Sequence, residues 1–203
     1  MPRSQAGAWE RGNTPLSRIE RRLYIGCMHE PPPIEVMAAG KYLRLVKRGH
    51  WEYADRHTCT GAVAIVAVTE NRRLLLVEQY RIPLGKNVLE LPAGLAGDAP
   101  GEQHEELAVA ARRELAEETG YEAGEMQWLV AGPSSAGLTS EVVDFFLATG
   151  LKRVGAGGGD HQEDIVVHEV PLQNVRQWLA ERAAAGMLVD PKVYAGLFML
   201  QNC

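Results

Sequence analysis

The sequence predicts an α+β fold in which helices pack on a mixed sheet. Short apolar runs typical of strands alternate irregularly with helical segments, and neither a regular strand–helix–strand repeat nor a Gly-x-Gly-x-x-Gly element occurs. The chain has 203 residues, of which 46% are hydrophobic and 23% charged. This is the composition of a globular domain that is long enough to bury a sizeable core.

The N-terminal part is expected to differ from the rest of the chain. Residues 1–20 are polar and the prolines at 31–33 form a stiff extended segment, so 1–40 is interpreted as a tail and connector. Residues 41–48 and 51–53, with a turn at Gly49, indicate a strand pair. This pair defines a small N-terminal β subdomain at 41–58, and 59–203 forms the main domain.

Within 59–203, apolar runs predict strands at 62–68, 74–77, 88–91, 142–148 and 165–170. A helix rich in Ala, Leu, Arg and Glu is expected from about Glu102 or Glu105 to Thr119, where Gly120 ends it. Further helices are expected around 175–185 and from 191 to about 201. The glycine-rich segment 155–159 is interpreted as a flexible loop.

Charge and cysteine content exclude several classes of protein. The net charge of −5 argues against a basic surface for nucleic acid or an anionic membrane. No apolar run approaches the ~20 residues of a membrane span, and the N-terminus lacks the apolar region of a secretory signal. Cys27, Cys59 and Cys203 are widely spaced, which favours neither disulfides nor a cysteine zinc site. A cytoplasmic location is therefore expected.

Three carboxylates share one face of the helix that ends at Thr119. At about 100° per residue, Glu114, Glu117 and Glu118 fall within an arc of roughly 100°. Like charges at this spacing repel one another, and the helix dipole disfavours acids at a C-terminus. A divalent cation such as Mg²⁺ would offset both penalties, because it prefers carboxylate oxygens. The alternative is a solvated acidic face with arginine partners.

The surrounding residues resemble the Nudix box, in which a glycine, five residues, a glutamate and seven residues precede Arg-Glu-apolar-x-Glu-Glu-x-Gly. The chain has Glu90-Leu91-Pro92-Ala93-Gly94, then Glu105 and, after seven intervening residues, Arg113-Glu114-Leu115-Ala116-Glu117-Glu118-Thr119-Gly120. Ala99 replaces the leading glycine, and the loop before Glu105 is longer than in the family. Gly101-Glu102 is therefore an alternative glycine–glutamate pair for this position.

This resemblance implies an α/β/α sandwich and a site for Mg²⁺, with Mn²⁺ as a possible substitute. It assigns the metal to Glu114, Glu117, Glu118 and the carbonyl group of Ala93. It assigns a structural role to Gly94, Glu105, Arg113 and Gly120, with Arg113 paired to Glu105 or Glu102.

Two further segments resemble the branch of this family that cleaves ADP-ribose and other nucleoside diphosphate sugars. One is Glu78-Gln79-Tyr80-Arg81, which precedes Glu90; here the resemblance implies that Arg81 and Glu90 bind substrate. Arginine suits phosphate because its donors form a planar fork. The other is 134–141, where Gly137 and Glu141 match the Ser-Pro-Gly-x-x-x-Glu pattern of the branch, although Ala136 replaces the proline.

The resemblance implies hydrolysis of a diphosphate bridge, most simply of ADP-ribose to AMP and ribose 5-phosphate. Glu141, or else Glu117 or Glu118, would accept the proton of the attacking water. Trp51 is the favoured aromatic for contact with the base, ahead of Tyr53 and Tyr80. UDP-glucose and GDP-mannose are alternative substrates, and a non-catalytic nucleotide-binding sensor is an alternative class. A homodimer is also implied, in which N-terminal strands of one subunit cover the base pocket of the other.

Overall fold

The computed structural model describes residues 31–98, 101, 104–159 and 164–201. The tail expected at 1–20, together with Cys27, Glu102 and Cys203, lies outside these residues. The strands are β1 (Ile34–Ala39), β2 (Leu43–Arg48), β3 (Trp51–Arg56), β4 (Gly61–Ala67), β5 (Arg73–Arg81), β6 (Lys86–Glu90), β7 (Ala93–Ala96), β8 (Tyr121–Glu122), β9 (Glu125–Pro133), β10 (Val142–Thr149), β11 (Lys152–Arg153), β12 (Ile165–Pro171) and β13 (Leu188–Val189). The helices are α1 (Leu107–Thr119), α2 (Val175–Ala184) and α3 (Pro191–Met199).

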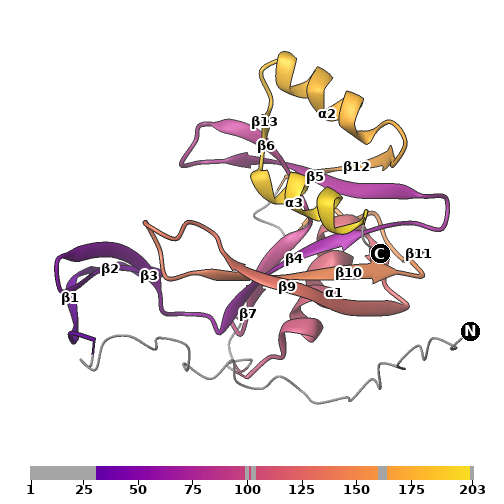
Figure 1. Ribbon diagram of the computed structural model, residues 1–203. Helices are drawn as coiled ribbons and strands as arrows, with labels where there is room; N and C mark the ends of the chain where they lie inside the picture. The colour runs from indigo at the N-terminus through magenta and orange to yellow at the C-terminus, as the bar shows by residue number, and fades with distance from the viewer. Residues whose placement is uncertain (1–30, 99–100, 102–103, 160–163, 202–203) are drawn as a thin grey trace, which may run out of the picture. The chain divides into compact units, whose positions relative to one another are not determined.

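Two four-stranded sheets form the main domain (Figure 1). One has the order β7-β4-β10-β9 and the other has the order β12-β5-β6-β13. Strand β10 runs parallel to β4, and β13 runs parallel to β6, whereas the other neighbours in these sheets are antiparallel. The predicted mixture of parallel and antiparallel pairing is confirmed, although the strands divide into two sheets.

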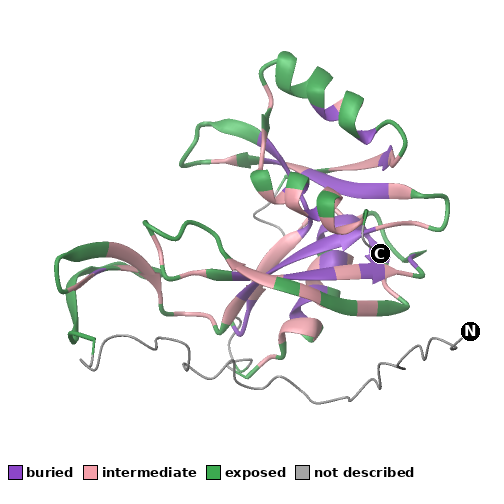
Figure 2. Cartoon of the chain, in the orientation of Figure 1, coloured by how far each residue is buried: buried purple, intermediate pink, exposed green. Residues whose placement is uncertain are grey.

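Strand β4 is buried on both faces, which explains its uninterrupted apolar run. Alternate residues of a strand point to opposite faces. One face joins a core cluster with α1, to which the members Val63, Ile65, Ala67, Ala110, Ala111 and Leu115 belong. The other face joins a cluster with α2 and α3, to which the members Ala62, Ala64, Val66, Val175, Leu179 and Val193 belong. The burial colouring in Figure 2 follows this arrangement, and the expected α/β/α sandwich is confirmed.

Two strands and the start of one helix differ from the sequence-based expectation. The connector expected up to residue 40 instead contains β1, which pairs with β2 as an edge strand. Strand β9 was not predicted, because its sequence ends in Gly132-Pro133 and its burial pattern, like its sequence, does not alternate regularly. The long helix begins at Leu107, later than expected, and ends as predicted at Gly120, which has a φ of +74°. No helix within the described ranges is both long enough and apolar enough to cross a membrane.

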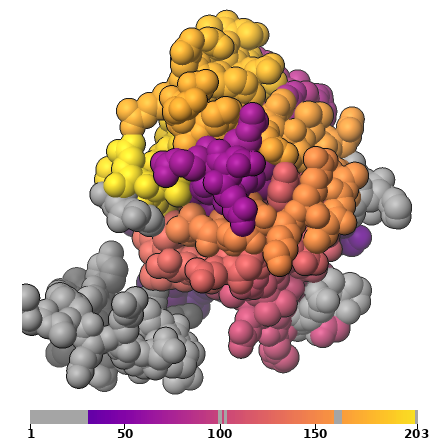
Figure 3. All heavy atoms as spheres, turned by 90° about the vertical axis from the view of Figure 1, so that its right-hand side faces the viewer, coloured from indigo at the N-terminus to yellow at the C-terminus, as the bar shows by residue number. Residues whose placement is uncertain are grey.

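The turn between β4 and β5 is tied to the segment that follows β12. The main-chain nitrogen of Leu172 donates to the Arg72 carbonyl at 3.0 Å, and the Arg73 side chain donates to the Glu169 carbonyl at 2.9 Å. Figure 3 shows this turn in purple at the surface, beside orange segments of the later chain. The C-terminal end of β4 is fixed here, while its N-terminal end borders the candidate site.

Candidate active site

A cavity of about 530 Å³ lies at the N-terminal end of β4. Its lining combines carboxylates with cations from several elements. The lining residues are Arg56, Ala62, Val63, Arg81, Glu90, Ala93, Gly94, Leu95, Asp98, Glu114, Glu141, Val143 and Lys192. Six of the predicted site residues are therefore brought to one cavity: Arg81, Glu90, Ala93, Gly94, Glu114 and Glu141.

The carboxylate of Glu114 lies directly against the main chain of Gly94. A side chain at position 94 would begin 2.1 Å from Glu114 Oε1, so only glycine leaves room for the carboxylate. The Glu114 side chain is 14% exposed, and this burial raises its pKa to about 7, although the neighbouring Arg113 favours the charged form. The fold thus holds a carboxylate where its negative charge is poorly solvated.

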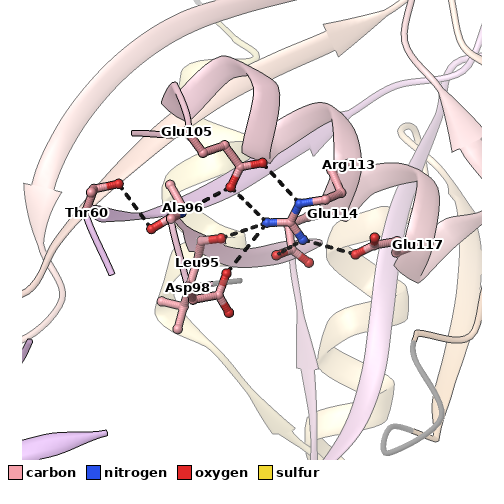
Figure 4. A network of polar contacts seen from close by, with 9 residues as sticks. Thr60, Leu95, Ala96, Asp98, Glu105, Arg113, Glu114 and Glu117 are labelled. Carbon is pink, nitrogen blue, oxygen red and sulfur yellow. Dashed lines mark hydrogen bonds and ion pairs between the residues drawn. The ribbon is translucent and has the colours of Figure 1, made fainter. Parts of the chain in front are cut away.

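Arg113 joins the carboxylates of the box to one another (Figure 4). Its guanidinium donates to Glu105 at 3.1 and 3.2 Å, to Glu114 Oε1 at 2.9 Å and to Glu117 Oε2 at 3.1 Å. It also donates to the carbonyl oxygen of Leu95 at 2.9 Å. The hydrogen bond from Arg113 holds the pKa of Glu105 below its usual value. Among the described residues, Glu105 is therefore the loop glutamate that partners Arg113.

The two other helix glutamates occupy different surroundings. Glu118 is 4% exposed, and its Oε2 accepts a hydrogen bond of 3.0 Å from the main-chain nitrogen of Ala93. The Glu117 side chain is 49% exposed and turns toward Arg113. Neither residue lines the cavity. Within the described part of the chain, no group of three or more His, Cys, Asp or Glu side chains lies close enough together to hold a metal ion.

The residues around Gly94 nevertheless fit a hard divalent cation. The predicted donors are carboxylate and carbonyl oxygens, which Mg²⁺ and Mn²⁺ prefer. Burial disfavours the charged form of Glu114. The Glu114 carboxylate also occupies the space that a side chain at position 94 would need. A cation in the cavity would favour that charge.

The C-terminus of α1 is fixed by the glycine segment 155–159. Gly158 N donates to the Glu118 carbonyl at 2.8 Å, and Gly159 N donates to the Glu117 carbonyl at 3.1 Å. Terminal carbonyls of a helix have no partner inside the helix, so these bonds satisfy groups that would otherwise need water. The predicted loop is confirmed, since residues 155–159 form neither helix nor strand, and it packs against the acidic end of the helix. Its flexibility stays a prediction.

Arg81 and Glu90 lie on neighbouring strands and form an ion pair at the cavity wall. Arg81 Nε donates to the two carboxylate oxygens of Glu90 at 3.0 and 3.1 Å. Glu90 is 7% exposed, so the pair holds the arginine in a defined orientation. The two residues predicted from the Gln-Tyr-Arg segment and the Glu-Leu-Pro segment are thus in direct contact.

Trp51 and Gly137 meet outside the cavity lining. Trp51 Nε1 donates to the Gly137 carbonyl at 3.2 Å, and Trp51 as a residue remains 52% exposed. Neither residue borders the 530 Å³ cavity of its own chain, and the same holds for Tyr53 and Tyr80. Contact of Trp51 with a base therefore stays a prediction.

Three charged residues of the lining were not predicted. Arg56 ends β3, Lys192 lies in the first turn of α3, and Asp98 follows β7. The position of Lys192 could have drawn attention in the sequence, because a cation near a helix N-terminus is unfavourable unless an acid offsets it. Asp190 is that acid, since it forms an ion pair with Lys192. Arg56 has no such signal in the sequence, since a charged residue at the end of a strand is common.

Comparison with known proteins identifies the family. Residues 60–188 match the NUDIX domain, and the chain therefore belongs to the Nudix family. The match includes the cavity residues from Ala62 to Glu141 and excludes the three strands of the N-terminal sheet.

Several relatives share the sequence across this region. A methanol dehydrogenase activator from Bacillus methanolicus is 40% identical over 60% of this chain and 64% of its own length. An ADP-ribose pyrophosphatase from Mycobacterium tuberculosis is 38% identical over 68% of this chain and 63% of its own length. This chain thus spans less than two thirds of the length of both. A GDP-mannose pyrophosphatase from Escherichia coli is 32% identical over 70% of this chain and 73% of its own length.

A solved structure supports the fold. The crystal structure of an ADP compounds hydrolase superposes with a TM-score of 0.67 and covers 87% of this chain and 95% of that chain. The sequences are 20% identical, so this likeness concerns the fold alone.

Proposed function

We propose that the protein is a Mg²⁺-dependent Nudix hydrolase that cleaves the diphosphate bridge of a nucleoside diphosphate sugar. The preferred substrate in this proposal is ADP-ribose, and the products are AMP and ribose 5-phosphate. The observation that carries it is the Glu114 carboxylate held against Gly94 in a cavity that also presents Arg56, Arg81 and Lys192. Such a cavity suits a cation and an anionic substrate side by side. Relatives named ADP-ribose pyrophosphatase support the choice of substrate.

In this proposal, Glu114, Glu117, Glu118 and the Ala93 carbonyl hold Mg²⁺, which Mn²⁺ can replace. The bound cation would neutralise diphosphate charge and lower the pKa of a water molecule. Glu118 is oriented by the Ala93 main-chain nitrogen, and Glu114 is held by its contact with Gly94. Arg113 keeps the helix against the loop through Glu105 and does no chemistry.

Glu141 is proposed as the base that accepts the proton of the attacking water, with Glu117 or Glu118 as alternatives. It lines the same cavity as Glu114. Arg81 and Lys192 are proposed to contact phosphate oxygens, and the Glu90 carboxylate fixes the plane of the Arg81 guanidinium. These contacts would bind the diphosphate next to the carboxylates that hold the cation.

A different sugar nucleotide is the second candidate substrate. The relative named GDP-mannose pyrophosphatase is aligned over 73% of its length and favours GDP-mannose as this alternative, with UDP-glucose as a further one. The base-reading residues decide between these substrates, and none of the aromatic candidates lines the cavity of the single chain.

The test is a panel of nucleoside diphosphate sugars assayed with Mg²⁺ and a coupling phosphatase that releases phosphate from the monophosphate products. We expect the fastest turnover with ADP-ribose, loss of activity with EDTA and recovery with Mg²⁺ or Mn²⁺. Fastest turnover of GDP-mannose would replace the proposed substrate while keeping the reaction. Tight binding of one compound without hydrolysis of any would instead favour a nucleotide sensor.

We further propose that the protein is a cytoplasmic homodimer whose N-terminal sheet, β1-β2-β3, contributes to the interface and covers the partner's substrate. Support comes from large apolar side chains that are exposed on this sheet, namely Ile34, Val36, Met37, Leu43, Leu45 and Trp51. Exposed apolar groups that gather on one element are typical of an interaction surface. Sedimentation velocity of the full chain tests the dimer, and a single species with the monomer mass at micromolar concentration would contradict it.

A further inference from the structure

Strand β3 is joined by main-chain hydrogen bonds to the loop that carries Glu141. The nitrogen of Ala54 donates to the Leu138 carbonyl at 2.8 Å, and the nitrogen of Ser140 donates to the Ala54 carbonyl at 3.2 Å. Ala54 and Thr139 form a parallel bridge. The loop therefore runs beside β3 as a short additional strand would.

Side chains of the next two residue pairs after Ala54 and Thr139 are also in contact. Ser140 Oγ donates to Asp55 Oδ1 at 2.8 Å, and Arg56 Nε donates to Glu141 Oε2 at 3.2 Å. Both pairs have the same sequence offset, so they extend the parallel register of the main-chain bonds. Asp55 is held in turn by an ion pair with Arg44 of β2. The whole contact is thus anchored in the N-terminal sheet.

Arg56 lies at the boundary between two hollows. It borders the 530 Å³ cavity and a neighbouring cavity of about 300 Å³, and Glu141 borders both as well. The two side chains are 29% and 24% exposed. Across the described residues, Arg56 is the side chain that hydrogen-bonds the Glu141 carboxylate. The orientation of this carboxylate therefore depends on an arginine from a different part of the fold.

We propose that Arg56 is the positioning residue for Glu141 and that β3 holds the catalytic loop of its own chain in place. The proposal rests on the role proposed above for Glu141 as the base. A base has to stay within hydrogen-bond reach of the water that it deprotonates, and a carboxylate on a loop gains that precision from a charged donor. The N-terminal sheet then acts within one chain, separately from any role in a dimer.

A double-mutant cycle tests this proposal on the full-length protein with ADP-ribose and Mg²⁺. Arg56→Gln is expected to lower kcat by roughly tenfold to a hundredfold with KM changed less than about twofold, because a small displacement of a reacting group has this effect. In the Glu141→Gln background, Arg56→Gln should lower kcat no further. Arg56→Lys should restore part of the loss. Arg176→Gln, at an exposed position of α2, is the matched control and should leave kcat unchanged.

Two results would overturn the proposal. If the effects of Arg56→Gln and Glu141→Gln on kcat multiply, Arg56 acts independently of Glu141. If KM rises while kcat stays constant, Arg56 binds substrate and does not position the base.

Amide hydrogen exchange of the free protein gives a readout that needs no turnover. Residues 134–141 should exchange faster in Arg56→Gln than in the wild type or in Arg176→Gln, while β5 stays unchanged. Equal exchange in all three proteins would contradict anchoring by β3. Because this measurement is independent of hydrolysis, failure of the substrate panel and failure of the anchoring proposal remain distinguishable.

Discussion

A side chain at Gly94 would begin 2.0 Å from Cδ of Glu114, so the glutamate carboxylate occupies space that any other residue at position 94 would need. Strand β7 and helix α1 are thereby brought together at one point, where the main chain of the strand touches the functional group of the helix. The main chain of β7 therefore bounds the Glu114 carboxylate on one side, and the carboxylate borders the cavity.

Gly94→Ala is therefore expected to displace Glu114 and to reduce kcat/KM by about a hundredfold. Binding of Mn²⁺, measured by electron paramagnetic resonance without substrate, should weaken as well. Gly132→Ala is the matched control, because nothing lies within 4 Å of a side chain built there. Activity of Gly94→Ala near that of the control would show that the position of Glu114 does not matter for the reaction.

Glu118→Gln is expected to lower turnover by roughly a hundredfold or more while the protein remains folded. Glutamine has the same shape and keeps an oxygen that can accept the hydrogen bond from Ala93 N, so the substitution removes mainly the charge. Turnover and the thermal unfolding midpoint are measured together. Glu122→Gln, on the exposed position of β8, serves as the control. A fully active Glu118→Gln enzyme would refute the assignment of Glu118 to the metal.

Arg113→Ala is expected to lower the free energy of unfolding by about 2 kcal/mol, because it leaves the Glu105 carboxylate without its charged partner. The Glu105 side chain is only 6% exposed. Arg112→Ala removes one hydrogen bond to the Ala123 carbonyl from an exposed side chain and should change the free energy by less than about 1 kcal/mol. Urea unfolding of the two variants measures the difference. Equal losses would mean that the Arg113 network adds no stability of its own.

The stability of the protein should depend on pH through Glu78. Hydrogen bonds from Asn87 and His168 hold the pKa of Glu78 below its usual value of 4.5 and link β5 to both neighbouring strands. A carboxyl group with a lowered folded-state pKa stabilises the protein above the unfolded-state pKa, and this contribution is lost as the pH falls through the folded-state value. The thermal unfolding midpoint of Glu78→Gln should therefore lie below that of the wild type at pH 7. The difference between the two midpoints should become smaller below about pH 4.5. A difference that stays constant would contradict this linkage.

The acidic face of α1 could be predicted from the sequence because its residues are neighbours along the chain. The spacing of Glu114, Glu117 and Glu118 fixes their common face once the segment is helical, and Gly120 fixes the end of the helix. For the partner of Arg113, the resemblance to the box left Glu105 and Glu102 open, and the structure shows Glu105. Strand β4 was predicted with equal ease, since burial on both faces leaves a continuous apolar run.

Features that depend on distant residues could not be predicted in this way. Arg56 and Glu141 are separated by 85 positions, and no local pattern of either residue points to the other. Strand β1 has six exposed residues, so it lacks the alternation that marks a half-buried strand. The ion pair of Arg113 with Glu117 matches the alternative of an acidic face with arginine partners, because the arginine lies four residues earlier on the same helix face. The metal role of Glu117 stays a prediction.

The glycine segment has a consequence for the order in which the molecule assembles. Two carbonyls at the end of α1 receive their hydrogen bonds from Gly158 and Gly159, and a side chain at Gly157 would collide with the main chain of Thr119. During synthesis the helix therefore leaves the ribosome well before the residues that complete it. A nascent chain that stops ahead of residue 155 lacks the donors for these two carbonyls, so the last turn of α1 should fray until the glycines have been added and have folded against it.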